Sequence, residues 1–241
     1  MIHIGLSGYS YPEWQGEGRF YPRGLKRDDF LKFYSSRFNA LEGVGTWRHL
    51  PTEKMVAKWI EHTDADFRVT PKMHQKVTHL SRLKPEGLET LETFVRLLGP
   101  LEAAGKLGPT MLQLPPNMKR NDELLETFLG SIPHRPTLPW TMGFRHESWN
   151  APEVEDILRR FGVGWVAEET EEYEAELRDT ADHIYVRLRK DAYPEEALQK
   201  WAEFAVAKAA EGKRCYVFCK HQDAEAPWVW GDRLRELVGN T

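Results

Sequence analysis

The stretch WTMGFRHESW, residues 140–149, runs from a short apolar segment directly into an arginine, a histidine, a glutamate and a second tryptophan. Its apolar part, residues 140–144, has the length and composition of a buried strand. An abrupt polar ending can occur in any surface loop for solubility alone. It gains meaning only if other strands of the chain end in the same way.

Short apolar segments alternate with amphipathic ones along the whole chain. Eight of the apolar segments are predicted to be strands, at residues 2–8, 39–44, 66–72, 110–114, 141–145, 163–168, 183–189 and 215–220. The second and sixth are the weakest, because Gly43, Gly45 and Gly164 lower strand propensity.

The segments between the strands carry helix signals. Thr52 and Asn121 are suited to cap helices with apolar faces, and Pro152 suits a first helical turn. We expect helices that begin near Asp28, Thr52, Pro85, Asn121, Ala151, Pro194 and Trp228. The glutamate-rich run at residues 168–176 is interpreted as a solvated loop or a short helix.

The alternation predicts one domain over residues 1–241, since no linker-like stretch interrupts it. Eight strand–helix units in this length average about thirty residues each, the size of one βα crossover unit. The predicted fold is therefore a (β/α)8 TIM barrel, a closed parallel sheet of eight strands with outer helices. An open doubly wound sheet is the alternative, and the strand count favours closure.

Composition places the chain among ordinary globular proteins, with 41% hydrophobic and 29% charged residues. Cys215 and Cys219 would lie about 13 Å apart on one face of a strand, too far for a disulfide. No apolar run approaches membrane-spanning length and the first residues show no signal-peptide pattern, so we expect a cytoplasmic protein without a membrane partner.

Polar side chains end each predicted strand, and a closed barrel would gather them on one rim. These residues are Ser7 and Tyr9, Glu42, Lys72, Gln113, Arg145 and His146, Glu168, Arg187 and Arg189, and Lys220 and His221. The stretch at residues 140–149 is thus one of several such endings.

The sign of the charge on this rim differs from that of the whole chain. The formal net charge is -4, yet residues 67–84 contain no acid, five Lys or Arg and two His. A cleft of one sign concentrates ions of the other sign, so the predicted partner is a small anionic ligand or a nucleic-acid fragment. Aromatic residues on the same loops would suit stacking on a sugar or a base: Tyr9, Tyr11, Trp14, Trp47 and Trp149.

The arginines and the acid of the rim each have a structural and a functional interpretation. Arg145 and Arg187 could hold an anion or pair with carboxylates of neighbouring strands. Glu42 could act as a general base, or it could neutralise Arg145 or Lys72.

The other rim residues leave the same choice open. Lys72 and Lys220 could be solvated, or could carry a lowered pKa and act as a base or a Schiff-base amine. His79 and His146 could be hydrogen-bonded scaffold or proton-transfer groups. The tryptophans could anchor loops or form ligand platforms.

Several kinds of site are not indicated. No spaced motif joins the histidines and glutamates, and neighbouring cations would oppose a divalent ion, so we expect no metal site. The chain has no phosphate-binding P-loop and no Gly-x-Gly-x-x-Gly after a strand, and its cofactors stay undetermined. Ser7 and Ser148 lack the context of a serine nucleophile.

Six stretches in this order resemble the YecE-like domain-of-unknown-function family: GLSGYSYPEWQGEGRFYP, VTHLSRL, LGPTMLQLPP, GFRHESW, HIYVRLRK and YVFCKHQDAEAP. The resemblance runs from Ile4 to the final helix. It implies a TIM barrel and no established activity, cofactor or catalytic residue. The chain departs from the family pattern at Gly43-Val44, where Ile-Asn is common, and at Gly143, where an acid is usual. A mechanism that needs two acids near Arg145 is put in doubt by this.

These observations lead to three functional hypotheses. The first is an enzyme, such as a hydrolase or lyase, that acts on a phosphate-containing or otherwise anionic substrate, with Glu42, His146 and Lys72 as catalytic candidates. The substrate-binding candidates are Tyr9, Trp14, His79, Gln113, Arg145, Trp149, Arg187, Lys220 and His221. The second is a non-catalytic nucleic-acid or nucleotide-binding module, and the third is a barrel used for protein interaction.

Overall fold

A computed structural model describes residues 1–220 and 226–239, and its sheet contains eight parallel strands. They follow the order β3-β2-β1-β8-β7-β6-β5-β4. Their bounds are β1 Ile2–Ser7, β2 Ala40–Gly43, β3 Arg68–Pro71, β4 Thr110–Gln113, β5 Trp140–Gly143, β6 Gly164–Glu169, β7 His183–Leu188 and β8 Arg214–Cys219. All eight predicted strands are confirmed, each with ends within about two residues of the expectation.

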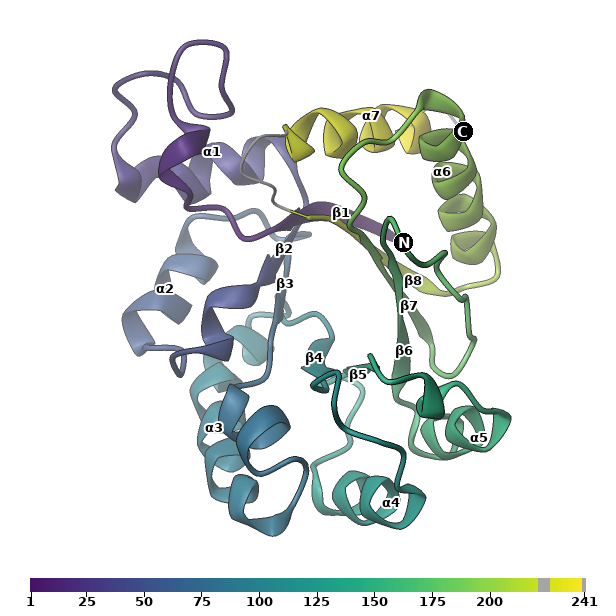
Figure 1. Ribbon diagram of the computed structural model, residues 1–241. Helices are drawn as coiled ribbons and strands as arrows, with labels where there is room; N and C mark the ends of the chain where they lie inside the picture. The colour runs from purple at the N-terminus through teal and green to yellow at the C-terminus, as the bar shows by residue number, and fades with distance from the viewer. Residues whose placement is uncertain (221–225, 240–241) are drawn as a thin grey trace.

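The two ends of the strand order meet, so the sheet is nearly closed into a barrel (Figure 1). Between β3 and β4 the pairing reduces to two parallel bridges, Val69 with Leu107 and Lys72 with Met111. The backbone N–H of Gly108 donates to Val69 O at 2.8 Å. Proline at position 71 has no N–H to donate, which helps to explain the sparse hydrogen bonding at this seam.

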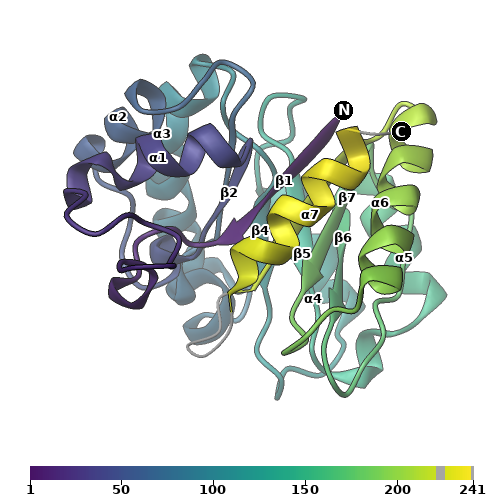
Figure 2. The same cartoon turned by 90° about the horizontal axis from the view of Figure 1, so that it is seen from above.

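Seven helices surround the strands, as Figure 1 shows. They are α1 Phe30–Arg37, α2 Glu53–Glu61, α3 Leu88–Ala103, α4 Asp122–Ser131, α5 Pro152–Phe161, α6 Glu195–Ala210 and α7 Pro227–Gly239. Both predicted caps are confirmed: Thr52 Oγ1 accepts from Met55 N at 3.2 Å, and Asn121 Oδ1 accepts from Leu124 N at 2.9 Å. Figure 2 shows α6 and α7 side by side over β8 and β1.

The sixth strand departs from the expected strand–helix alternation. Within the described ranges no helix follows β6, and residues 170–182 run as a loop into β7. In Figure 1 no helix stands between α5 and α6 on the outside of the sheet. The segment TEEYEAELRDTAD has no continuous apolar stripe to bury against a strand, and it forms a solvated loop, one of the two forms that the sequence left open.

Side chains fill the barrel interior and the layer between sheet and helices. The interior cluster consists of Ala40, Met111, Val166, Tyr185, Tyr216 and Phe218. This packing fills the middle of the barrel, so a ligand can reach inward-facing charged side chains only at the ends of the strands. Cys215 and Cys219 are buried free thiols, as expected.

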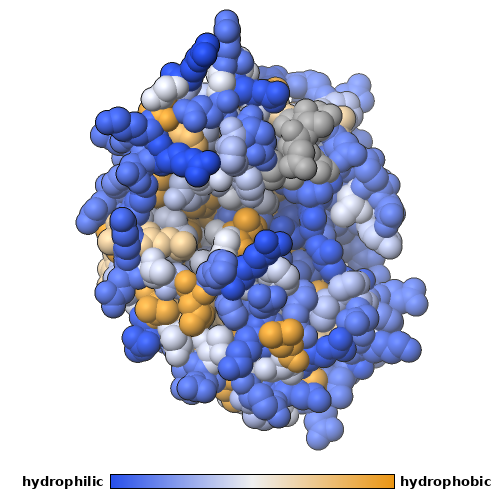
Figure 3. Space-filling model, turned by 60° about the vertical axis from the view of Figure 1, so that its left-hand side comes forward, coloured by the Kyte–Doolittle hydropathy of each residue, from blue (hydrophilic) through white to orange (hydrophobic). Residues whose placement is uncertain are grey.

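The face of the molecule seen in Figure 3 is mainly polar. Figure 3 shows the side that carries α1, α2 and α3, where apolar residues form small patches separated by hydrophilic ones. In the described part of the chain, no helix has the length and apolar character needed to cross a membrane.

Candidate anion-binding site at the carboxyl ends of the strands

The alternation of side chains along each strand, together with the register between strands, brings charged side chains together at one end of the barrel. Side chains two residues apart lie on the same face of a strand, and register places Ser7 beside Glu42 and Glu168 beside Arg187. The group at this end of the barrel is called the mouth cluster. It consists of Glu42, Lys72, Arg145, Glu168, Arg187 and Arg189.

Glu42 is the most enclosed member of the mouth cluster, with 0% of its surface exposed. Arg187 contacts both its oxygens: Nε lies 2.8 Å from Oε1, and Nη2 donates to Oε2 at 3.1 Å. Ser7 Oγ donates to Oε2 at 2.6 Å, and the Tyr185 hydroxyl donates to Oε1 at 2.9 Å. Glu42 thus neutralises Arg187, not Arg145 or Lys72 as the sequence suggested.

These donors decide the protonation state of Glu42. Burial alone would raise the pKa of Glu42, but the Arg187 charge and the hydrogen bonds from Ser7, Arg187 and Tyr185 outweigh it and lower that pKa. The carboxylate is ionised at neutral pH and its oxygens are already occupied. This arrangement suits a positioning residue better than a proton acceptor.

Glu168 is shared among three arginines. It accepts from Arg187 Nη1 at 2.6 Å, from Arg189 Nη1 at 3.0 Å and from Arg145 Nη2 at 3.4 Å. Burial opposes its ionisation, but the charges of Arg187, Arg189 and Arg145 outweigh the burial and lower the pKa of Glu168 to about 2. Arg187 therefore bridges the two carboxylates of the mouth cluster.

Gln113 lies next to this bridge and fills the space beside Gly143. Its Nε2 donates to Gly143 O at 3.0 Å, and its Oε1 is 3.5 Å from Arg187 Nη1. A Cβ at position 143 would lie only 2.8 Å from Gln113 Oε1. The amide of Gln113 thus occupies the space next to β5 into which a side chain at position 143 would extend.

Lys72, directly after β3, differs from the other cations because it has no carboxylate partner. Its Nζ lies over the Trp47 ring, 5.3 Å from the centroid. Across the described residues this nitrogen takes part in no hydrogen bond and no ion pair. Burial first, and then the Arg187 charge, lower the pKa of Lys72 from 10.5 to about 8, with Glu42 opposing the shift. At pH 7 about one tenth of this amine is therefore unprotonated, and most of it still carries a positive charge.

The mouth cluster carries an excess of positive charge. Its two carboxylates face four cations, so its formal charge is +2 (four minus two). Arg145 is exposed, while Lys72 and Arg189 are half-buried, so solvent reaches them. Lys220 adds a further cation nearby, since burial and then Arg189 lower its pKa.

His79 stands at the edge of this cluster, beside Trp47. Trp47 Nε1 donates to His79 Nδ1 at 3.4 Å, and Thr78 Oγ1 lies 2.8 Å from the same nitrogen. Burial and the Lys72 charge lower the pKa of His79, which favours its neutral form. Because His79 Nδ1 accepts the hydrogen bond from Trp47, the ring proton of neutral His79 lies on Nε2.

Other expected site residues do not join the mouth cluster. His146 caps a short 3-10 helix, Glu147–Trp149, because its Nδ1 accepts from Ser148 N at 3.2 Å. Tyr9 is half-buried, and its backbone oxygen accepts from the Tyr21 hydroxyl. His221 lies outside the described residues.

The two tryptophans expected as stacking platforms are core residues. Trp14 and Trp149 are each 1% exposed. The Trp149 Nε1 donates to Met118 O at 2.7 Å, and its ring packs on Phe144. Trp14 packs against Phe20 and other aromatic rings. Neither has a free face for a ligand, so both act as loop anchors, the other interpretation that the sequence left open.

Four residues belong to the site although the sequence did not select them for catalysis or binding: Ser7, Glu168, Tyr185 and Arg189. The two-residue alternation of side chains along a strand is the signal that could have identified them. Positions 185, 187 and 189 alternate toward the interior, so an inward Arg187 implies two inward neighbours.

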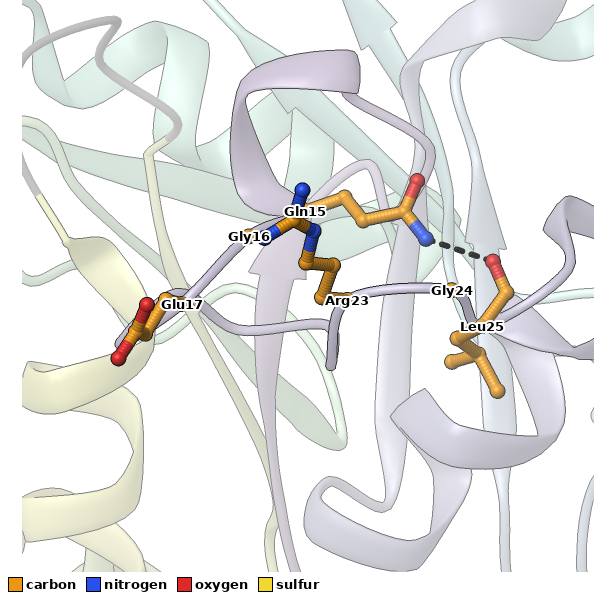
Figure 4. Close-up of a pocket in the computed structure, with 6 residues that line it drawn as sticks. All are labelled: Gln15, Gly16, Glu17, Arg23, Gly24 and Leu25. Carbon is orange, nitrogen blue, oxygen red and sulfur yellow. Dashed lines mark hydrogen bonds between the residues drawn. The ribbon is translucent and has the colours of Figure 1, made fainter.

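Two surface hollows lie away from the mouth cluster. Figure 4 shows one on the loop after β1, lined by Gln15, Gly16, Glu17, Arg23, Gly24 and Leu25. Its Gln15 amide is already used by Leu25 O at 2.6 Å. The other lies between α2 and α3 and is lined largely by aliphatic carbon. Neither hollow concentrates charge of one sign.

The described residues include no group of three or more His, Cys, Asp or Glu side chains placed to hold a metal ion.

Comparison with known proteins gives relatives whose names state no activity. The UPF0759 protein YecE of Escherichia coli K12 is 32% identical over 134 residues, which cover 55% of this chain and 45% of that protein. The UPF0759 protein YunF of Bacillus subtilis 168 is 25% identical over 171 residues, 69% of this chain and 59% of that protein. The chain thus matches about half the length of these curated relatives.

Solved structures share the fold over the full chain. A DUF72 family protein of Thermotoga maritima (TM1631) gives a TM-score of 0.78 at 25% identity, covering 99% of both chains. One from Enterococcus faecalis (EF0366) gives 0.77 at 15% identity over 99% of this chain and 98% of that one. The structure described as AsfvAP:AG gives a TM-score of 0.63 at 9% identity, covering 100% of this chain and 97% of that one. At this identity it shares the fold alone. The family described as "Protein of unknown function DUF72" matches residues 3–241, so this chain belongs to the DUF72 family, as its ordered motifs indicated.

Proposed function

We propose that the protein is an enzyme that binds a phosphate-containing anionic substrate at the barrel mouth. Arg145 and Arg189 would hold the anion, the protonated form of Lys72 would strengthen its binding, and the neutral form of the Lys72 amine would react. The observation that carries this proposal is the uncompensated positive charge of the mouth cluster, centred on a lysine that no described carboxylate neutralises.

Charge balance supports a phosphate. The cluster has a formal charge of +2, and a phosphate monoester carries about -1.5 to -2 near neutral pH. Guanidinium groups match the oxygens of phosphate in a two-pronged geometry. One phosphate would therefore balance the cluster, whereas a single carboxylate would leave it positive.

The contacts of the catalytic candidates favour Lys72 over the other two. Glu42 is fixed by Arg187, Ser7 and Tyr185, and His146 is used in a local cap. Lys72 combines access to solvent with a pKa near the working pH, the property that suits both proton transfer and nucleophilic attack. Glu42 and Glu168 would then hold the arginines in place.

The compact arrangement of the cations favours a small ligand over a nucleic-acid strand. Three arginines share the single carboxylate of Glu168. A protein that follows a polynucleotide backbone needs cations spread along a groove. The likeness of fold to AsfvAP:AG gives no independent support for a nucleic-acid substrate, because the identity is only 9%.

The test is calorimetric titration of inorganic phosphate into the protein at pH 7.5. The K72M variant should bind phosphate roughly tenfold or more weakly, because a hydrogen bond to a charged group contributes about 1.5–3 kcal/mol. The matched control is K200M, which removes an exposed lysine on the outer helix α6 and should leave affinity unchanged. Absent binding by the unaltered protein, or equal binding by K72M, would refute the proposal.

A further inference from the structure

The environment of the Lys72 amine is unlike that of the other enclosed lysine. Lys106 is buried, but its Nζ donates to Ile60 O and Thr63 O, each at 2.7 Å. Lys72 Nζ has only the face of Trp47, and its hydrogen-bonding capacity is unused among the described residues. The lone pair of its neutral form is therefore not engaged by the protein.

The charges around Lys72 come from three strand ends, those of β2, β5 and β7, and from one loop. Arg187, Arg189 and Arg145 are positive, and Glu42 is negative but turned to Arg187. His79 faces it from the loop after β3 in its neutral form. Crowded cations disfavour the ammonium, which is a recognised way to make a lysine nucleophilic.

We infer that Lys72 is a covalent catalytic residue that forms an imine with an aldehyde or ketone bearing a phosphate group. The inference rests on the proposed anion site, because Arg145 and Arg189 would hold the phosphate while the carbonyl meets the amine. A phosphorylated open-chain sugar has both groups.

The step is balanced without any further reactant. The neutral Nζ attacks the carbonyl carbon, and a carbon–nitrogen bond forms. The carbonyl oxygen takes up the two protons that the amine gives up and leaves as water, so the carbon–oxygen bond breaks. Protonation of the imine nitrogen then gives an iminium ion that withdraws electrons from the neighbouring carbon. Nothing is oxidised or reduced.

Reductive trapping tests the inference on the unaltered protein. The protein is incubated with glycolaldehyde phosphate and sodium cyanoborohydride at pH 7.5, and the modified lysines are identified by peptide mass spectrometry. With a pKa of about 8 in place of 10.5, Lys72 has on the order of a hundredfold more neutral amine than an unperturbed lysine. We therefore expect Lys72 to be labelled on the order of a hundredfold faster than Lys200, and inorganic phosphate to protect it.

Two variants separate chemistry from binding. K72R keeps the positive charge but cannot form an imine, so it should still bind phosphate and lose the fast labelling. K200R should retain both. Labelling of Lys72 at the same rate as Lys200 while phosphate binds normally would overturn the imine and leave the anion site standing. Failure of phosphate to bind would overturn both.

Discussion

Two ionisable residues on neighbouring strands show how the local environment decides a role. Glu42 is the next-to-last residue of β2 and Lys72 follows β3, and both are enclosed charged groups at the barrel mouth. Glu42 receives hydrogen bonds from three different side chains, whereas Lys72 receives no such compensation. A buried charge that is paired contributes to structure, and an unpaired one remains available for a ligand.

Removal of the Glu42 charge should destabilise the fold. E42Q leaves the buried Arg187 with one carboxylate in place of two, and breaking a buried pair costs about 3–5 kcal/mol. We expect a loss of about 3 kcal/mol in the free energy of unfolding, because Glu168 still compensates Arg187. Urea denaturation measures it. S7A, which removes one hydrogen bond to the same carboxylate, should cost less, and an E42Q loss below about 1 kcal/mol would contradict the structural role.

The pH dependence of anion binding should follow Lys72. Since its pKa is lowered to about 8, the protonated form that attracts an anion is lost as pH rises through 8. Affinity for sulfate, whose own charge is constant, should therefore be highest below pH 8 and fall by up to tenfold per unit above it. Calorimetry from pH 7 to 9.5 measures this. K72R should give a flat profile, and the same fall in K72R would assign the titration to another group.

At the scale of elements, β7 contributes most to the site by a simple alternation. Tyr185, Arg187 and Arg189 point to one side, while Val186 and Leu188 pack against the helices. The apolar runs, caps and turn residues predicted all eight strands and the seven helices, because these depend on local patterns. The alternation of side chains along a strand also predicts which residues point into the barrel, once one inward residue is known.

The partners inside the mouth could not be predicted in the same way. That Glu42 meets Arg187, 145 residues later, depends on the strand order, which places β1 and β8 between β2 and β7, and on the register across these strands. The burial of Trp14 and Trp149 depends on the course of loops, which no periodic signal describes. The segment between β6 and β7 forms a loop, whereas its composition is compatible with either a loop or a short helix.

Helix caps and the mouth cluster should be energetically separate. N121A removes the Oδ1 acceptor at the start of α4, on the outside of the barrel. The free energy of unfolding should fall by about 1 kcal/mol, the usual value of such a cap. Sulfate affinity should not change, because α4 contributes no residue to the mouth cluster. A parallel loss of affinity would show that the site depends on the packing of this helix.

At the scale of the whole molecule, charge is sorted by location. The chain carries a formal net charge of -4, yet the mouth cluster carries +2. Acidic residues occupy outer helices and the loop after β6, where water screens them. This contrast raises the local concentration of anions at one end of the barrel without making the surface basic as a whole.

A compact cluster and an extended groove differ in how affinity depends on ligand length. A mononucleotide 5′-phosphate and a single strand of about twelve nucleotides should bind within about threefold of each other, because only one phosphate occupies the mouth. Fluorescence competition measures both. An affinity that rises steeply with strand length would instead favour a nucleic-acid-binding module.

The most direct measurement is the position of a bound tetrahedral dianion. Crystals soaked in tungstate should show their strongest anomalous difference peak within hydrogen-bonding distance of Lys72, Arg145 and Arg189, and K72M crystals should lose most of it. Peaks found only elsewhere, with the mouth cluster closed on its own carboxylates, would contradict the assignment of this end of the barrel as an anion site.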